Sequence, residues 1–492
     1  MAVIEWVLRE ILTSPTTLFI IVVATILFHV FLKEAKYGQN FPSGPWGLPF
    51  VGVLPFLGDH PEITMMEWAK KYGKVFSVRM GPETVIMLQG YEAVMDAFSR
   101  KATVFSGRPH IPVFDIMNDR GLVVLDYGPA FTAQRQFTMQ YIAHANNEKH
   151  IDGEVDALLR YIREQRGEPF QFNFPMKATT SNVIGTVLFG SRQEYDDPVF
   201  KRLLQVFQKA MLLSGQLSIR QFLPFLSFIP SVDERKAAWG EFSDILNEKL
   251  VEHRATYREG TTRGFIDAFI HKIIENENGV QNLFTEADLL PSLLTLYFAG
   301  SDTVYLTLSW GMLFLLHHPA VCKRIQDELD REVGKSRRPT LADRQNLPYT
   351  NAALMEVQRL NFIAPISGPH KALRTVNFRG YTIPEGTTVL ANQWSIMMDE
   401  EKWPNPQQFD PSRFLDEFGN VKKNVAWIPF SVGKRSCPGE VLARQEIFLV
   451  LTALLQAFSF RSPDGEALPE CVGKTGSLYV CPDFNVCAVP RF

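Results

Sequence analysis

The stretch Phe430-Ser431-Val432-Gly433-Lys434-Arg435-Ser436-Cys437-Pro438-Gly439-Glu440 decides how the rest of this chain is interpreted. Two glycines and one proline confine the backbone around a single cysteine to a tight, irregular loop. Residues 441–458 follow with apolar side chains at helical spacing, so Cys437 should lie at the N-terminus of a buried helix. That position, with Lys434 and Arg435 beside it, favours a thiolate. The plainer alternative is a buried structural cysteine.

The pattern Phe-x-x-Gly-x-Arg-x-Cys-x-Gly in this loop resembles the haem-binding loop of the cytochrome P450 monooxygenases. The resemblance implies that Cys437 is the axial thiolate ligand of haem b iron, where it favours cleavage of the O–O bond. It also implies that Phe430, Gly433 and Gly439 surround the cofactor. The implied fold is the haem-thiolate fold, mainly α with minor β.

Length and composition fit a large enzyme with an apolar pocket. The chain has 492 residues, of which 46% are hydrophobic and 12% aromatic, and residues 60–492 contain no dividing linker. The net charge of -3 gives no reason to expect nucleic-acid binding. The five cysteines form no Cys-x-x-Cys pair, which argues against a disulfide framework or a zinc site and suits a reducing compartment.

The N-terminal segment predicts a membrane anchor within residues 1–37. Residues 18–32 are apolar except for one threonine and one histidine, and their neighbours extend the run towards the ~20 residues that span a bilayer. A cleaved signal peptide is the competing interpretation, but no Ala-x-Ala-like site is present. Lys33 and Lys36 outnumber Arg9, which places the body of the protein in the cytosol. The location expected for such a chain is the endoplasmic reticulum membrane.

The rest of the chain divides into a connector and one catalytic domain. Residues 41–52 contain three prolines and three glycines, and they resemble the hinge of the microsomal members of the family, so we expect a hinge at 38–52 and a catalytic domain at 53–492. Period-2 patterns predict a hairpin at 75–80 and 84–88 and β patches at 373–390 and 475–490. Helical spacing predicts helices at 91–99, 128–146, 151–165, 178–190, 197–213, 232–258, 264–276, 286–317 and 319–334.

A second motif, Ala299-Gly300-Ser301-Asp302-Thr303, lies inside a long apolar helix that begins with a capping box at 285–288. By resemblance, Ala299 and Gly300 let haem approach the helix backbone, and Asp302 and Thr303 pass protons to the distal side. The alternative is structural, with the threonine bonded to a backbone carbonyl and the aspartate solvated. Val304 stands where the family often has a second hydroxyl, which leaves the relay with one hydroxyl fewer.

Two further motifs concern support of the cofactor site. Glu356 and Arg359 share a helix face at spacing i,i+3, a pattern that is common by itself. The stretch Trp403–Phe414 resembles the meander before the cysteine loop. It implies that Arg413 joins Glu356 and Arg359 in a buried network that braces the proximal side.

The resemblance also assigns the residues that hold the haem propionates. These are Arg435, His370 and Arg135, since carboxylates prefer fixed cations and donors. The family usually has tryptophan where this chain has Phe131, which keeps the packing and loses one N–H donor. Residues 105–109 resemble the segment before the family's flexible substrate loop.

Together the motifs imply a membrane-anchored monooxygenase, most like the family 2 group, that inserts one oxygen atom from O2 into an apolar substrate. The chain has no Gly-rich dinucleotide or flavin segment, so its electrons must come from a partner. That partner is NADPH–cytochrome P450 reductase by resemblance, with cytochrome b5 as a second candidate donor. Two alternatives are a haem-thiolate isomerase or peroxygenase that needs no reductase, and a haem sensor or carrier without enzymatic activity.

Substrate contacts are expected from segments 107–125, 204–226, 292–303, 363–368 and 474–480, by analogy with the family. Their apolar content leaves steroid, fatty acid and xenobiotic substrates equally open. The named candidates are Phe114, Phe207, Phe222, Leu296, Phe298, Ile363 and Ile366. The apolar run 221–230 suits shallow insertion into a membrane, or else it belongs to the core or the pocket.

The face that should meet the electron donor is poor in cations. Arg135 is the only cation of the stretch 131–140. We therefore expect weak docking in which Lys422, Lys423, Lys434 and Arg444 supply most of the attraction, and the alternative is docking through apolar contacts.

Overall fold

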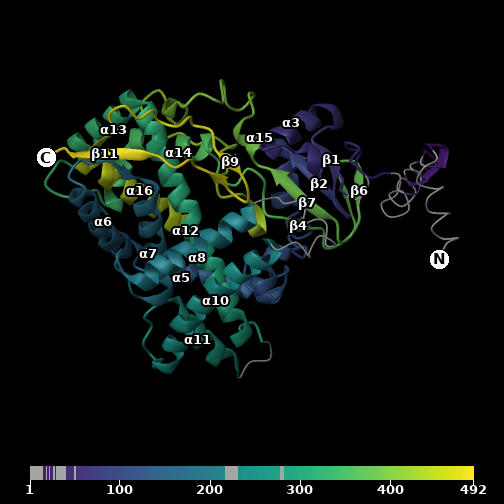
Figure 1. Ribbon diagram of the computed structural model, residues 1–492, viewed down its shortest axis with the longest axis horizontal. Coiled ribbons are helices and arrows are strands. Elements are labelled where there is room, and N and C mark those ends of the chain that lie inside the picture. The colour runs from purple at the N-terminus through teal and green to yellow at the C-terminus, as the bar shows by residue number, and fades with distance from the viewer. Residues whose placement is uncertain are drawn as a thin grey trace.

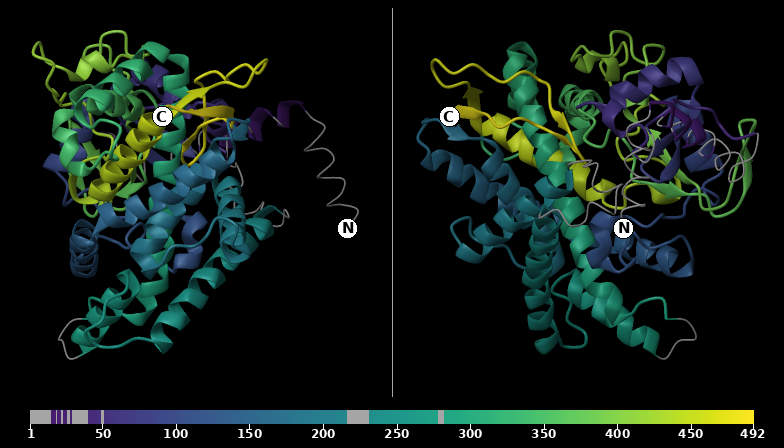
Figure 2. Two further views of the ribbon diagram at one scale, coloured as in Figure 1. Left: turned by 90° about the vertical axis from the view of Figure 1, so that its left-hand side faces the viewer. Right: turned by 45° about the vertical axis from the view of Figure 1, so that its right-hand side comes forward.

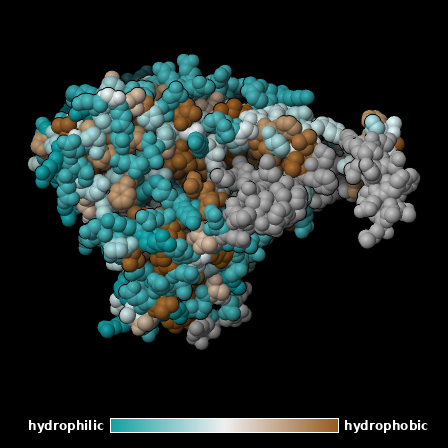
Figure 3. Space-filling model, viewed as in Figure 1, coloured by the Kyte–Doolittle hydropathy of each residue, from teal (hydrophilic) through white to brown (hydrophobic). Residues whose placement is uncertain are grey.

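The computed structural model describes residues 15–17, 19–21, 23–25, 28, 40–48, 51–215, 231–277 and 282–492. Figures 1 and 2 show a large helical part and, beside it, a smaller part built around a sheet. Figure 3 shows that the face seen in Figure 1 is mostly hydrophilic, with hydrophobic residues exposed in separate patches. The fold is mainly α with minor β, as predicted.

Most helices lie where apolar spacing predicts them. They are α3 (Pro61–Tyr72), α4 (Gly90–Met95), α5 (Pro129–His144), α6 (Asn147–Glu164), α7 (Asn173–Phe189), α8 (Pro198–Gly215), α10 (Ser231–Ala255), α11 (Phe265–Glu277), α12 (Glu286–His317), α13 (Pro319–Glu332), α14 (Pro348–Leu360), α15 (Trp394–Met397) and α16 (Glu440–Ala457). The short turns are η1 (Leu54–Phe56), η2 (Asp96–Arg100), η3 (Pro112–Met117), η5 (Leu341–Asn346), η6 (Pro411–Phe414) and η7 (Gly433–Arg435). Of the longer helices, α3 and α14 lie outside the ranges predicted from apolar spacing.

In the part of the chain that the structure describes, the strands form four small sheets. The largest has the order β1-β2-β7-β4, with β2 and β7 parallel and the other pairs antiparallel. The predicted hairpin is confirmed as β1 and β2, with Val75 opposite Leu88. The strands are β1 (Val75–Met80), β2 (Glu83–Gln89), β3 (Phe170–Gln171), β4 (His370–Lys371), β5 (Val376–Phe378), β6 (Tyr381–Ile383), β7 (Thr388–Asn392), β8 (Phe458–Arg461), β9 (Lys474–Thr475), β10 (Tyr479–Val480) and β11 (Asn485–Pro490).

The described part of the proline-rich segment lies against β1. Ser77 donates a side-chain hydrogen bond of 2.7 Å to the Pro42 carbonyl oxygen, and its backbone N–H donates to the Ser43 carbonyl oxygen at 3.0 Å. A Cβ atom on Gly44 would lie 1.6 Å from the Ser77 carbonyl oxygen, so only glycine allows this approach. The prolines and glycines therefore fit this segment to the edge of the sheet.

Helix α12 runs through the core, and its neighbour α7 packs closely against it. The predicted capping box is present, because Asp288 accepts hydrogen bonds from the Thr285 backbone N–H at 2.9 Å and hydroxyl at 2.6 Å. A Cβ atom on Gly300 would lie 2.7 Å from Cγ1 of Ile184 on α7. The mid-helix glycine is thus needed for the close packing of two helices.

No single helix among the described residues is both long and apolar enough to cross a membrane. Helices α12 and α13 meet those criteria only as a pair, bent by 108°. A short apolar helix covers Pro15–Thr25 and includes residues outside those described. Much of the predicted anchor, and the whole apolar run 221–230 with Phe222, lie outside the described residues.

Candidate functional site

The cysteine loop is held by its own backbone and by its approach to η2. Cys437 donates its backbone N–H to the Phe430 carbonyl oxygen at 2.9 Å. Gly433 has φ +81°, and a Cβ atom there would lie 1.6 Å from the Phe98 carbonyl oxygen. Glycine is therefore required, both for the left-handed backbone and for the contact. Gly433 and Lys434 are the exposed residues of the loop, so this part of it lies at the molecular surface.

The environment of the sulfur differs from the one the sequence predicts. Burial raises the pKa of the Cys437 thiol, the Gly439 backbone N–H and the Arg135 guanidinium lower it, and the Glu440 carboxylate raises it. Among the cations, Arg135 is the one that lowers the pKa of this thiol, and Lys434 and Arg435 are not among the groups that shift it. A metal ion at this position would deprotonate the thiol outright.

Arg435 joins the cysteine loop to the segment before α5. Its three side-chain nitrogens donate to the carbonyl oxygens of Ser106, Leu122 and Leu125, at 2.9, 3.2 and 2.7 Å. The Phe131 ring lies beneath its guanidinium, with Cζ 3.7 Å from the ring centroid. Phenylalanine thus keeps the packing expected at this position and holds the arginine by a cation–π contact.

Positive charge is concentrated near Cys437, where the charges of Arg108 and Arg135 both lower the pKa of Arg435. Arg108 donates through Nε to the Val123 carbonyl oxygen at 2.8 Å and through Nη1 to that of Pro369. Burial lowers the pKa of Arg108 to about 10 and that of Arg435 to about 9, with Arg108 lowering the latter further. The negative charge of Asp126 raises the pKa of both arginines and so partly offsets these effects. A cofactor with a thiolate-bound metal and two carboxylates fits this arrangement, and haem b is such a group.

His370 is buried and neutral in this arrangement. Its Nδ1–H donates to the Phe105 carbonyl oxygen at 2.6 Å, and its ring stacks on Phe98 with centroids 3.8 Å apart. Burial, and then the charges of Arg108 and Arg435, lower the pKa of His370 to about 3. Its Nε2 then accepts rather than donates, and only an adjacent carboxylate would favour the doubly protonated ring.

In helix α12, the charge nearest in effect to Asp302 is that of Lys177, a residue that the sequence did not single out. Burial raises the pKa of Asp302 to about 7, and Lys177 of α7 is the charge that lowers it. Lys177 is held over the Tyr305 ring, with Nζ 5.0 Å from the centroid. The charge of Asp483, which is exposed at the surface, also raises the pKa of Lys177 against the effect of burial.

Ala299 and Thr303 lie one turn apart on α12. The Thr303 hydroxyl donates to the Ala299 carbonyl oxygen at 2.7 Å, which is the structural alternative stated above. Ala299 is exposed although the residues before it in the helix are mostly buried. Since Gly300 faces Ile184, Ala299 is the residue of the pair that leaves space beside the helix.

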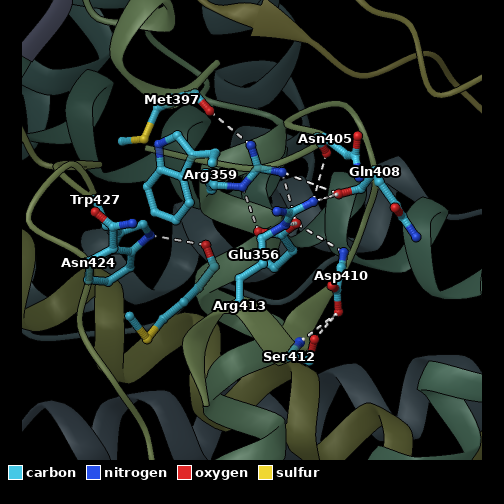
Figure 4. A network of polar contacts seen from close by, with 12 residues as sticks. Glu356, Arg359, Met397, Asn405, Gln408, Asp410, Ser412, Arg413, Asn424 and Trp427 are labelled. Carbon is cyan, nitrogen blue, oxygen red and sulfur yellow. Dashed lines mark hydrogen bonds and ion pairs between the residues drawn. The ribbon is translucent and has the colours of Figure 1, made fainter. Parts of the chain in front are cut away.

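The glutamate and the two arginines form the network that the sequence predicts (Figure 4). Arg359 donates to both Glu356 oxygens at 2.6 and 2.8 Å, and Arg413 donates to Glu356 Oε1 at 3.2 Å. Arg413 also reaches the Asn405 carbonyl oxygen at 2.7 Å. Glu356 and Arg359 are fully buried, and breaking such a pair on one side costs roughly 3–5 kcal/mol. The network fixes the meander that leads into the cysteine loop.

The predicted substrate contacts are not gathered in one place. Phe114 and Phe298 meet with ring centroids 6.0 Å apart, and both are half-buried. Phe207 packs in the core against Phe242 and Tyr297, and Leu296 is also buried there. Ile363 accepts the Tyr479 backbone N–H through its carbonyl oxygen, and Ile366 packs against the cluster around β1 and β2.

The sequence analysis missed Arg108, Lys177 and Trp239. Arg108 stands in the segment 105–109, whose pattern was recognised without a role for the arginine. Lys177 and Trp239 carry no local signal, because each acquires its role through residues more than fifty positions away in the chain.

Three features of this site are those of a haem-thiolate protein. They are a thiol at the start of a helix, a buried network of two arginines and a glutamate, and buried cations that suit two carboxylates. The family model for cytochrome P450 matches residues 42–487. Cytochrome P450 2J2 of Homo sapiens is 32% identical over 489 residues, which cover 97% of this chain and 96% of that protein. Cytochrome P450 2C3 of Oryctolagus cuniculus is 33% identical over 471 residues, or 93% and 96% of the two chains. Cytochrome P450 18a1 of Drosophila melanogaster is 32% identical over 473 residues, or 92% and 87%.

The chain belongs to the cytochrome P450 family and is most similar to its microsomal family 2 group. It is therefore a monooxygenase whose cofactor is haem b with a cysteine thiolate ligand.

Proposed function

We propose that this monooxygenase inserts one atom of O2 into a lipophilic small molecule with electrons from NADPH, delivered by NADPH–cytochrome P450 reductase at the endoplasmic reticulum membrane. The observation that carries the proposal is the cysteine loop with its buried cations. Cys437 would be the axial ligand, and Arg108, Arg135, Arg435 and His370 would surround the propionates. Haem b supplies the redox-active iron at which O2 is activated.

The overall reaction consumes O2, two electrons and two protons for each substrate hydroxylated, and it releases one water. The residues of α12 serve the two protons. Asp302 can hold a proton near neutral pH, because burial raises its pKa to about 7. Thr303 points its hydroxyl proton at Ala299, so it can accept a hydrogen bond from water, and it must release that contact to pass a proton on. Val304 offers no second hydroxyl to take over.

The electron donor would dock at the surface around the cysteine loop, where Lys434 is exposed. The exposed residues of α5 include no lysine or arginine. Arg444 forms an ion pair with Glu440 at 2.7 Å and lies over the Trp427 ring. Its charge is therefore largely neutralised within the protein and offers little attraction to a donor. Exposed apolar side chains occur on α5, on the segment that precedes the cysteine loop in the chain, and at the start of α16. They are Met139, Phe418, Val425 and Val441. We infer that apolar contacts anchor the donor and that the lysines at 422, 423 and 434 act at the rim.

Two measurements test this function. Ferrous protein with CO should give the long-wavelength Soret band of a thiolate ligand, and Cys437→Ala should lose it. Product formation from lipophilic compounds should require O2, NADPH and reductase together. A Cys437→Ala variant that keeps the band would remove the central assignment.

The competing peroxygenase or isomerase function would show as turnover with peroxide and none with reductase. The pair Asp302 and Thr303 favours the reductase-dependent reaction, since only that reaction needs both protons delivered. A haem sensor would bind haem and give no product under either condition.

A further inference from the structure

A cavity of about 500 Å³ lies between α6, the beginning of α7 and the segment 192–201 that leads into α8. Helices α6 and α7 lie side by side in the helical part (Figure 1). None of the lining residues belongs to the cysteine loop or to the segments expected to contact substrate. The charged residues that line the cavity at positions 160, 164, 194, 196 and 201 are exposed, so it opens at the surface. Its volume is in the range of pockets that hold small molecules.

Three aromatic rings line this cavity and contact one another through Tyr161 of α6. The centroid of the Tyr161 ring lies 6.1 Å from that of Phe174 and 5.8 Å from that of Tyr195. The interplanar angles are 51° and 59°, so neither neighbour stacks flat on Tyr161. All three residues are half-buried, which leaves part of each ring accessible to a ligand. The faces of such rings carry negative partial charge and attract cations.

Buried polar groups hold the segment that carries Tyr195. The hydroxyl groups of Tyr195 and Thr179 form a hydrogen bond of 2.8 Å. Asn182 of α7 fixes the backbone at Gln193, because its side chain accepts the Gln193 N–H at 2.9 Å and donates to the Gln193 carbonyl oxygen at 2.7 Å. The wall is therefore formed before a ligand arrives, and binding costs little ordering of these residues.

Arg192 is shared between two carboxylates at this wall. Its Nε donates to Glu154 Oε2 at 3.0 Å, and its Nη1 donates to Glu194 Oε1 at 2.6 Å. Burial raises the pKa of the Glu154 carboxyl, and the Arg192 guanidinium acts against this rise and favours the ionised form. One positive charge thus stands between two negative ones, and Glu194 directly precedes Tyr195 in the chain.

The remaining charges of the lining balance one another. Glu164 and Asp196 supply two exposed carboxylates, and Arg160 and Lys201 supply two exposed cations. The excess negative charge of the cavity therefore comes from the group around Arg192, on the side of the aromatic rings. An anion placed there would meet carboxylates, whereas a cation would meet both the carboxylates and the ring faces.

We propose that this cavity is a second ligand site, separate from the haem site, and that it binds a small organic cation with a methylated ammonium group. The methyl groups would contact the rings of Tyr161, Phe174 and Tyr195, and the positive charge would lie near Glu194. The inference does not rest on the monooxygenase function proposed above, because it concerns binding alone.

The test compares three soluble probes of nearly equal size that differ in charge: choline, 3,3-dimethylbutanol and 3,3-dimethylbutanoate. Their dissociation constants are measured on the ferrous CO complex of the holoenzyme, which is diamagnetic, by ligand-observed NMR titration at low salt. We expect choline to bind most tightly and the anion least. A quaternary ammonium group cannot ligate iron, and choline should leave the Soret band of the ferric protein unchanged.

Variants of the aromatic wall measure the contribution of the rings. Tyr161→Leu should raise the dissociation constant of choline by roughly 2- to 5-fold, the range that cation–π contacts supply at exposed sites. Tyr161→Phe keeps the ring and should keep most of the affinity. Neither variant should change the affinity for 3,3-dimethylbutanol as much as that for choline, because the alcohol carries no charge.

Exposed charges around the opening give a second, independent measurement, which decides the question if Tyr161→Leu folds poorly. Glu164→Gln should weaken choline binding and Lys201→Gln should strengthen it, each by roughly 2-fold at low salt and less at high salt. Glu168→Gln, an exposed position outside the lining, is the matched control and should have no effect.

Phosphocholine is a fourth probe that distinguishes two sources of the cation. Tighter binding than choline would identify a lipid headgroup, whose phosphate Arg160 and Lys201 would hold, and weaker binding would identify a free cation. The inference is overturned if the alcohol or the anion binds as tightly as choline, or if choline shifts the Soret band. It is also overturned if Glu164→Gln and Lys201→Gln change choline binding in the same direction or not at all.

Discussion

Arg135 of α5 donates a hydrogen bond of 2.6 Å to the carbonyl oxygen of Ser436, the residue directly before Cys437. A second contact reaches the Ser436 hydroxyl oxygen at 3.1 Å. The same guanidinium lowers the pKa of the Cys437 thiol against the effect of burial. One residue of α5 thus positions the cysteine loop and favours the ionised sulfur.

Replacing Arg135 should therefore weaken thiolate ligation. In Arg135→Leu we expect a larger share of the ferrous CO complex in the short-wavelength form that indicates a protonated or lost thiolate, and faster loss of haem. Gln136→Leu, an exposed neighbour on the same helix, is the matched control. Equal spectra and equal haem loss in the two variants would show that Arg135 does not support the ligand.

Thr303→Ala should keep haem and substrate binding while diverting electrons to peroxide. The reason is that Val304, the next residue, has no hydroxyl. Replacing Thr303 therefore removes the last hydroxyl group of this helical turn that can pass a proton. The measurement is product formed per NADPH consumed, together with peroxide released. Thr303→Ser keeps the hydroxyl and should keep most of the coupling, and a ratio that Thr303→Ala leaves unchanged would remove Thr303 from the mechanism.

Lys177→Met should move the pH dependence of coupling to higher pH. Burial raises the pKa of Asp302 to about 7 and the Lys177 charge lowers it, so removing that charge raises the pKa further. The midpoint of product per NADPH should shift upward between pH 6 and 9, whereas Lys177→Arg keeps the charge and should leave it nearly in place. A profile unaffected by Lys177→Met would separate this lysine from Asp302.

The same carboxyl should affect stability in a defined direction. In the unfolded chain the pKa of Asp302 lies near its ordinary value of 3.8, and in the folded protein burial raises it to about 7, so the folded state binds more protons between these values. Its contribution to stability is greatest below pH 4 and is lost as the pH rises to about 7. Asp302→Asn should remove this loss, which chemical denaturation at pH 5 and pH 8 can measure.

Gly300→Ala should destabilise the protein by overpacking α7 against α12. The new Cβ atom would lie 2.7 Å from Ile184 Cγ1, and such strain costs roughly 1–3 kcal/mol, partly offset by higher helix propensity. Gly311→Ala in the same helix makes ordinary contacts of 3.6 Å and should be neutral or stabilising by up to about 1 kcal/mol. The double variant Gly300→Ala with Ile184→Ala should cost less than the sum of the two single changes. If the free-energy costs of the two single changes simply add in the double variant, the strain does not arise from the contact between residue 300 and Ile184.

Donor docking should depend more on Phe418 than on the lysines. Phe418 is 81% exposed in a turn fixed by Asp416, which accepts the Phe418 and Asn420 backbone N–H groups at 2.9 and 2.8 Å. Phe418→Ser should raise the reductase concentration for half-maximal turnover. Replacing the lysines at 422, 423 and 434 by alanine should mainly reduce the salt dependence, because rim charges act on association rate. A triple lysine variant with unchanged salt slope, or a Phe418→Ser variant with unchanged half-saturation, would contradict the respective role.

The sequence alone determined the family, most of the helices and the position of the cysteine loop. These depend on short-range constraints: glycine and proline fix the backbone next to Cys437, apolar spacing marks α12, and the box at 285–288 marks its start. Each can be read within one or two helical turns, because backbone sterics and side-chain periodicity act over that range.

Only the tertiary structure decided which partners those residues meet. The sequence placed Arg435 beside the thiol, but packing turned it to the carbonyl oxygens of the 106–125 segment and brought Arg135 to the sulfur instead. Gly300 was expected to admit haem, and it faces Ile184. The contact of Arg108 with Pro369 and that of Trp239 with Phe114 each join segments over a hundred residues apart, where side-chain packing and not local periodicity selects the neighbour.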